Sequence, residues 1–241
     1  MKKIIKVVTL TGADDSINPQ DLFSLSAEFP FVEWGILFSR ASEGKPRYPS
    51  RRWVHRLYEE WCRSNLPLNF CGHICGRWVR DICAGTWTIL DYDKENPPEV
   101  MDMFKRFQLN FHAQVHSLSE SPFIEGLKKT AHRQFIFQLD NVNNSILNIA
   151  QYNGIDAVPL FDLSGGAGVL PEEWPRANGY CGYAGGLSPE NLATQLPLIA
   201  EVAGDGPIWI DAETRVRSED DQLFDLEKVR NFLDIAKEWV I

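Results

Sequence analysis

Short apolar runs alternate along the chain with longer segments of helical pattern. The short runs are rich in β-branched and aromatic residues and have the length of strands. Eight of them are present, at residues 6–11, 32–39, 68–73, 107–112, 135–140, 157–162, 179–183 and 208–211. Helical segments are predicted from residue 19, where Asn18 and Pro19 supply a cap and a first turn, and at 50–62, 77–82, 122–131, 144–152, 190–202 and 226–239.

This alternation predicts an α/β protein with a parallel sheet. Eight strands in 241 residues match the (β/α)8 TIM barrel, for which roughly 250 residues is usual. A doubly wound open sheet is the alternative, but no Gly-x-Gly-x-x-Gly follows the first strand. No linker or low-complexity tract divides the chain, so residues 1–241 are predicted to form a single domain.

The region from 85 to 103 fits the alternation least well. Residues 86–91 have the composition of a small extra strand, and Pro97 with Pro98 could open a helix.

Composition narrows the class of protein. No apolar run is long enough to span a bilayer, and Lys6 interrupts the first one, which predicts a strand rather than a secretion signal. The five cysteines are an odd number, typical of reduced thiols in a cytoplasmic protein. The net charge of −9 argues against nucleic acid as a partner. We therefore expect no membrane and no nucleic-acid partner, and a monomer or a homodimer.

Polar residues follow most of the predicted strands. In a barrel of this kind the carboxyl ends of the strands meet at one face, where the active site lies. Convergent polar groups are typical of a small-molecule site and favour an enzyme over a structural protein. The candidates are Thr11 with Asp14 and Asp15, Ser39 with Arg40 and Arg47, His73 with Cys75, His112, Asp140, Asp162, Gly185 with Gly186, and Asp211 with Glu213 and Arg215.

Asp162 ends an apolar strand and precedes a glycine-rich loop that contains Gly165 and Gly166. An apolar wall disfavours the charged carboxylate and raises its pKa toward the range useful for proton transfer. The glycines would let backbone N–H groups approach a ligand closely. The alternative is a loop aspartate that caps the following turn.

Gly185 and Gly186 lie between a strand and the Ser-Pro-Glu start of a helix. Exposed amides at the positive end of a helix bind anions. The alternative is an ordinary helix start, with Ser188 as the cap and Pro189 in the first turn.

These features carry a resemblance over the last third of the chain. Asp162 with its glycine-rich loop, the Ala-Gly-Gly-Leu-Ser-Pro-Glu-Asn of 184–191 and the segment 224–230 resemble phosphoribosylanthranilate isomerase. The resemblance implies a (β/α)8 barrel that performs an Amadori rearrangement of a phosphoribosyl amine without metal or cofactor. It implies Asp162 as the general acid and Arg47 as a substrate contact.

The sequence departs from that family at two strands. Thr11 stands where the family has its cysteine base, and a threonine hydroxyl titrates too high to act as a base at neutral pH without activation. The phosphate-binding Ser-Ser-Gly turn is replaced by residues 211–217. There Glu213 would repel a phosphate, and Arg215 or Arg217 could offset it.

A replacement base is therefore needed if proton transfer persists. His73 is the first candidate, because an unperturbed histidine has a pKa near neutrality, and Asp14 is the second. A histidine bonded to backbone is the alternative for His73. His112 and His116 could instead join Asp162 or Asp211 in a metal site.

The leading hypothesis is a divergent isomerase-like barrel that acts on a small sugar phosphate or related anionic metabolite by acid/base catalysis. It uses no cofactor and no metal. Its predicted catalytic residues are Asp162, His73 and Thr11, and its predicted substrate contacts are Arg47, Gly165, Gly166, Gly185, Gly186, Asp211 and Arg215. Two alternatives remain open: a non-catalytic ligand-binding barrel and a metal-dependent hydrolase or lyase.

Overall fold

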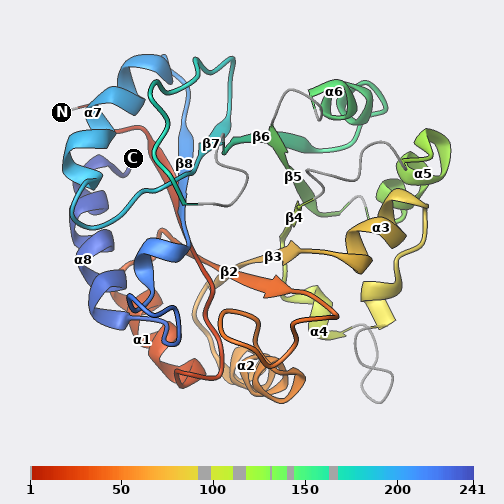
Figure 1. Ribbon diagram of the computed structural model, residues 1–241, viewed down its shortest axis with the longest axis horizontal. Coiled ribbons are helices and arrows are strands. Elements are labelled where there is room, and N and C mark those ends of the chain that lie inside the picture. Colours follow the sequence, from red (N-terminus) through yellow and green to blue (C-terminus); the bar gives the residue numbers. More distant parts are fainter. Residues whose placement is uncertain (1, 92–98, 111–117, 131, 140–143, 163–167) are drawn as a thin grey trace.

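Eight parallel strands close into a barrel in chain order, as the alternation predicts (Figure 1). The computed structural model describes residues 2–91, 99–110, 118–130, 132–139, 144–162 and 168–241. The strands are β1 (Ile5–Thr11), β2 (Val32–Phe38), β3 (Asn69–Ile74), β4 (Arg106–Leu109), β5 (Gln134–Leu139), β6 (Ala157–Phe161), β7 (Cys181–Tyr183) and β8 (Ile208–Ala212). The prediction of a (β/α)8 barrel is confirmed.

Helices surround the strands and cover their outer faces (Figure 1). They are α1 (Pro19–Glu28), α2 (Arg51–Arg63), α3 (Arg77–Cys83), α4 (Glu99–Asp102), α5 (Glu120–Lys129), α6 (Asn144–Tyr152), α7 (Leu192–Val202) and α8 (Leu226–Ala236), with 3-10 turns η1 (Thr88–Asp91), η3 (Thr214–Val216) and η4 (Lys237–Trp239). The side chain of Asn18 caps α1 by accepting from Gln20 N–H, and Pro19 occupies the first turn as predicted. Within the described ranges, no helix is both apolar enough and long enough to span a bilayer.

The extra strand predicted at 86–91 is wrong. Residues Thr88–Asp91 form the turn η1, and β3 pairs directly with β4, so the closed barrel leaves no edge for another strand. Asp81 of α3 holds this segment: its carbonyl oxygen accepts from Thr86 N–H at 2.8 Å, and its carboxylate accepts from the Thr88 hydroxyl at 2.5 Å. Pro97 and Pro98 lie outside the described residues, and α4 begins at Glu99.

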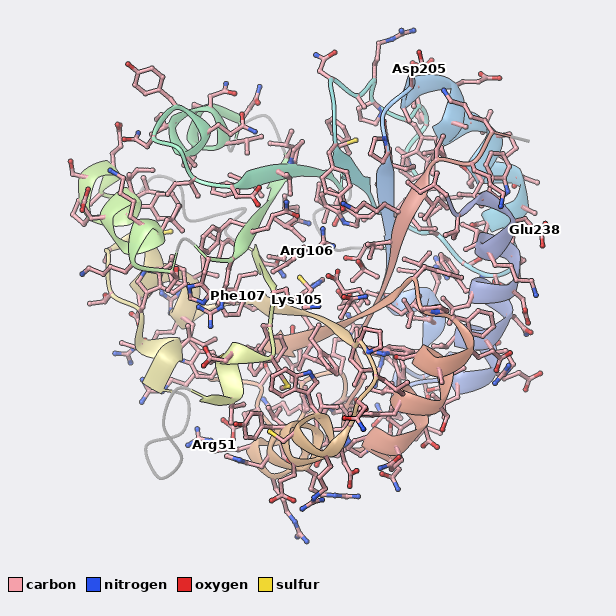
Figure 2. The ribbon with its side chains drawn as sticks, turned by 180° about the vertical axis from the view of Figure 1, so that it is seen from behind. Arg51, Lys105, Arg106, Phe107, Asp205 and Glu238 are labelled. Atoms are coloured by element: carbon pink, nitrogen blue, oxygen red, sulfur yellow. The ribbon has the colours of Figure 1, made fainter. Side chains whose placement is uncertain are left out.

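Side chains fill the barrel interior. One apolar cluster there comprises Cys71, Ile136, Val158, Leu160, Ala184 and Trp209. Toward the amino ends of the strands, Arg106 donates to both carboxylate oxygens of Glu33, at 2.9 and 2.6 Å. The Arg106 guanidinium lies 4.6 Å from the centre of the Trp209 ring, near the centre of the barrel (Figure 2). The interior is therefore packed, as is usual in this fold, and the accessible site lies at the carboxyl ends.

Candidate active site at the barrel mouth

A cavity of about 160 Å³ lies at the carboxyl ends of β4 to β8. It brings together five of the predicted site residues, which come from three different strand ends. These are Asp162, Gly185, Gly186, Asp211 and Arg215. The other lining residues are Gln108, Asn110, Gln138, Leu160, Gly168, Ala184, Leu187, Ala212, Glu213 and Thr214.

Asp162 follows β6 directly and lies in the wall of the cavity. It is only 7% exposed, and Leu160 of the same strand lines the cavity beside it. Gln138 of β5 donates from Nε2 to Asp162 Oδ2 at 2.6 Å. This bond fixes the direction of the carboxylate, so that its position at the mouth is defined by two neighbouring strands.

Asp211 of β8 is a second buried carboxyl group in the same cavity. The Thr11 hydroxyl donates to its Oδ1 at 2.9 Å. Burial raises the pKa of Asp211 well above its usual value, and the nearby carboxylates of Glu213, Glu33 and Asp162 raise it further, while the Thr11 bond acts in the opposite direction. Asp211 therefore keeps its proton to a higher pH than an exposed aspartate does.

We expect Asp211→Asn to stabilise the protein increasingly as the pH rises above about 4. In the wild type the unfolded chain loses the Asp211 proton before the folded state does, so that stability falls with rising pH until the folded pKa is reached. Asparagine removes this dependence, which amounts to about 1.4 kcal/mol per pH unit over that window. Urea unfolding of both proteins at several pH values measures it.

The control for this comparison is Asp205→Asn, because Asp205 is fully exposed and pairs with Lys2 at the surface. Its stability should follow the wild type at every pH. A stability difference between Asp211→Asn and the wild type that stays constant with pH would contradict the prediction.

Thr11 and His73 lie beneath the cavity and do not line it. Thr11 is fully buried and holds Asp211. His73 is 1% exposed, and its Nε2 is 4.0 Å from Asp211 Oδ2. Burial, assisted by the positive charge of Arg106, lowers the pKa of His73 to about 3, so the imidazole is uncharged at neutral pH. The alternative bond from His73 to backbone is not formed among the described residues.

Gly35 of β2 makes room for this cluster. It lies opposite Thr11 in the β1–β2 register. A Cβ atom on Gly35 would lie 2.1 Å from Thr11 Oγ1 and 3.0 Å from His73 Nε2. The absence of a side chain at this position therefore leaves room for both polar side chains beside Asp211.

Gly35→Ala should lower the free energy of unfolding by about 1–3 kcal/mol, the usual cost of overpacking a rigid interior. The methyl group would overlap Thr11 Oγ1 and force it away from Asp211. Urea unfolding measures the loss. Gly206→Ala is the matched control, because its Cβ would find no atom closer than 3.8 Å. Equal effects of the two substitutions would show that the position of Gly35 is not tightly packed.

Arg47 lies beside the mouth and is not among the cavity-lining residues. Its guanidinium donates to Glu213 at 2.5 Å and to Asp221 at 3.0 and 2.8 Å. Its backbone is in the left-handed region, with φ 65°, and its N–H donates to Asp14 Oδ2 at 2.5 Å. Among the described residues, Arg47 is thus the ion-pair partner of Glu213, where the sequence pattern had indicated Arg215 or Arg217.

A second arginine, which is fully buried, connects the loops after β1 and β8. Arg217 has a fully buried side chain that pairs with Asp14 at 2.8 Å and with Asp221 at 2.6 Å. It also donates to the carbonyl oxygen of Gly12. Asp14, the second candidate base, is thus held in an ion pair and is 3% exposed. We name the set Asp14, Arg47, Glu213, Arg217 and Asp221 the rim network.

The glycine turn after β7 presents unpaired amides. Gly185 and Gly186 have φ angles of 111° and 66°, which other residues rarely adopt. Within the described part of the chain their N–H groups have no hydrogen-bond partner. A Cβ on Gly186 would lie 2.5 Å from the backbone nitrogen of Leu170, so the turn packs closely against that loop.

Helix α7 begins at Leu192, not at residue 190 as predicted, and its cap position is Asn191, so Ser188 is not its N-cap. The reason is local: Asn191 Oδ1 accepts from Ser188 N–H at 3.0 Å, and Asn191 Nδ2 donates to the Gly186 carbonyl at 2.8 Å. Asn191 thus braces the glycine turn.

Arg215 lines the same cavity as that turn. Its guanidinium is exposed and lies 3.4 Å from the carbonyl oxygen of Gly168. It lines both the main cavity and an adjacent depression of about 300 Å³ that also includes Gly186 and Ser188. An anionic group between Arg215 and the glycine amides would meet positive charge from two sides.

Three amide side chains of the cavity were missed by sequence reasoning. Gln108, Asn110 and Gln138 come from the ends of β4 and β5. Gln108 and Gln138 could have been recognised as polar residues within strands that are otherwise apolar. A buried amide needs a hydrogen-bond partner, so its presence in such a strand indicates a polar site. Gly165, Gly166, His112, His116 and Asp140 lie outside the described residues. Among the residues that are described, no three His, Cys, Asp or Glu side chains are grouped to hold a metal.

The sequence matches no protein-family model and no curated protein. Among solved structures, the chain is similar to monomers generated from the dimeric phosphoribosylanthranilate isomerase of Thermotoga maritima, with a TM-score of 0.56, 19% identity and coverage of 97% of this chain and 99% of that one. At this identity the similarity establishes the fold, a (β/α)8 barrel.

Two further structures are similar at lower scores. KGPDC from Streptococcus mutans, solved in complex with a ligand, has a TM-score of 0.48 and 10% identity, covering 96% of this chain and 98% of that one. A GH113 β-1,4-mannanase has a TM-score of 0.44 and 10% identity, covering 98% and 99%.

Proposed function

We propose that this chain is an acid/base enzyme, an isomerase or a related activity, that acts on a small sugar phosphate or a related anionic metabolite. The observation that carries the proposal is the position of Asp162 and Asp211 in one cavity, which Arg215 and the turn at Gly185 and Gly186 also line. Two carboxyl groups in one cavity can divide the roles of base and acid between them. Asp211 is the group whose surroundings favour the protonated form.

The roles follow from position. Asp162, directed by Gln138, transfers a proton at the reacting carbon, and Asp211 is the second proton-carrying group. The amides of Gln108 and Gln138 face the polar part of the metabolite. Gly165 and Gly166 remain proposed ligand contacts.

The phosphate is proposed to occupy the corner between Arg215 and the turn at Gly185 and Gly186. Glu213 also lines the cavity and would repel it, but Arg47 neutralises that carboxylate through a 2.5 Å ion pair. Arg47 therefore supports the anion site by binding Glu213.

Deuterium exchange tests the proposal. The protein is incubated in D2O with a panel of pentose and hexose phosphates and the matching unphosphorylated sugars, and NMR follows deuterium incorporation and isomer formation. We expect exchange with a phosphorylated compound only. Binding without exchange would favour the non-catalytic barrel, and stoichiometric zinc or manganese in the purified protein would favour the metal-dependent hydrolase or lyase. Rescue of a tryptophan auxotroph that lacks phosphoribosylanthranilate isomerase tests that one reaction separately.

Arg215→Gln should weaken the binding of a phosphorylated compound about tenfold, because it removes one charge-assisted hydrogen bond. Calorimetric titration with ribose 5-phosphate, or with inorganic phosphate, measures the change. Arg51→Gln is the control, since Arg51 lies on α2 outside the barrel and pairs with Glu43 (Figure 2). Equal affinities for Arg215→Gln and the wild type would place the anion elsewhere.

A further inference from the structure

His73 and Asp211 form a buried polar pair inside the barrel, in which Asp211 lines the cavity and His73 lies beneath it. Their side chains are 1% and 7% exposed, and Nε2 of His73 is 4.0 Å from Oδ2 of Asp211. Neither ring nitrogen of His73 has a hydrogen-bond partner among the described residues. A buried polar side chain without a partner is costly and rare, so its placement needs a reason.

The surrounding strands direct the two side chains toward each other. Thr11 occupies Oδ1 of Asp211 by donating its hydroxyl proton at 2.9 Å, which leaves Oδ2 facing His73. Gly35 keeps the space open, because a Cβ there would lie 3.0 Å from His73 Nε2. A direct hydrogen bond requires the two atoms to approach by about 1 Å, a small rotation of either side chain.

The charges around the pair favour a single distribution of protons. Asp211 is faced by the carboxylates of Glu33 on β2, Asp162 after β6 and Glu213 after β8. Burial lowers the pKa of His73, and the positive guanidinium of Arg106 on β4 lowers it further. The buried thiol of Cys71 lies two residues before His73 on β3. Negative neighbours favour the protonated carboxyl group, and the positive neighbour disfavours an imidazolium. Of the two groups, Asp211 is therefore the one whose surroundings favour the proton, and the imidazole is uncharged at neutral pH.

We propose that His73 is a positioning residue, whose uncharged Nε2 accepts a hydrogen bond from the carboxylic acid of Asp211 and so holds a proton under the mouth of the barrel at neutral pH. The catalytic use of this proton rests on the proposed function. In that reaction Asp162 takes a proton from the metabolite and Asp211 gives one: its hydrogen bond to His73 is broken, the hydroxyl turns to the metabolite, and the O–H bond breaks as the new bond to the metabolite forms. After product release Asp162 loses its proton to solvent and Asp211 regains one, so the cycle is balanced.

Infrared spectroscopy of the ligand-free protein at pH 7 tests the pair. The difference spectrum between wild type and Asp211→Asn should contain the C=O band of one protonated carboxylic acid. In His73→Phe, which keeps a ring of similar shape but removes the acceptor, the band should move to higher frequency. The absence of an acid band would overturn the proposal, and so would a band that His73→Phe leaves unmoved.

A measurement on the wild type alone covers the case in which a variant fails to fold. In protein with 15N-labelled histidine, the His73 ring should remain uncharged from pH 5 to pH 9, with one nitrogen shifted as a hydrogen-bond acceptor. A ring that titrates near neutral pH would overturn the proposal. Neither experiment uses a substrate, so loss of the His73 role and loss of the sugar phosphate activity are separate results.

Discussion

Replacing Arg217 with methionine is expected to lower the free energy of unfolding by about 3–5 kcal/mol, the usual cost of breaking a buried ion pair from one side. The Arg217 side chain is fully buried, and that of Asp14 is 4% exposed. Methionine fills much of the same volume but leaves the Asp14 carboxylate without its cation. The carbonyl oxygen of Gly12 loses a donor as well.

Urea unfolding at pH 7 measures this effect, and Arg230→Met is the matched control. Arg230 also pairs with a carboxylate, that of Glu28, but both side chains are about half exposed. Exposed pairs contribute little, so the control should unfold near the wild-type midpoint. If the two variants lost similar stability, the rim network would behave as a surface ion pair.

The rim network also links stability to the proposed site. Arg217 and Arg47 share the carboxylate of Asp221, and Arg47 binds Glu213 at the edge of the cavity. A change at Arg217 therefore reaches Glu213 through a series of three ion pairs, Arg217–Asp221, Asp221–Arg47 and Arg47–Glu213. The loops after β1, β2 and β8 are held as one unit, which keeps the mouth in shape before a ligand arrives.

The barrel could be predicted because its signal is local. Each strand is a short apolar run and each following helix has its own pattern, so most boundaries agree within a few residues. Asn18 and Pro19 identified the start of α1 directly. The strand predicted at 86–91 is wrong because that prediction used only the β-rich composition of the segment. The pairing of β3 with β4 excludes another strand, and it depends on residues far outside the segment.

The candidate site could be predicted only in part. Asp162, Asp211 and Arg215 each lie at or after the end of a strand, and the fold brings strand ends to one cavity. The partner of Arg47 could not be predicted, because Glu213 and Asp221 lie 166 and 174 residues away along the chain. The same holds for His73, whose distance to Asp211 depends on the register of β3 relative to β8 and on Gly35 between them.

Asp162→Asn is expected to lower kcat about 100- to 10,000-fold for the metabolite that shows deuterium exchange, since asparagine cannot take or give the proton. Asparagine can still accept the hydrogen bond from Gln138, so the wall of the cavity and the binding of ligand should be retained. Steady-state kinetics together with calorimetric binding separates the two effects. A loss in kcat with unchanged affinity is the signature of a group that acts on the transition state.

Asp156→Asn is the matched control, because Asp156 lies immediately before β6 and Asp162 immediately after it. Asp156 accepts from Gln134 at 3.1 and 3.3 Å at the amino end of the barrel, the face that contributes to stability rather than chemistry. Its substitution should leave kcat unchanged.

If Asp162→Asn also retained full turnover, Asp162 would not take part in proton transfer. The proposal that two carboxyl groups of one cavity share the reaction would then be wrong. Equal ligand affinity in wild type and Asp162→Asn, with no turnover in either, would instead identify the barrel as a binding protein.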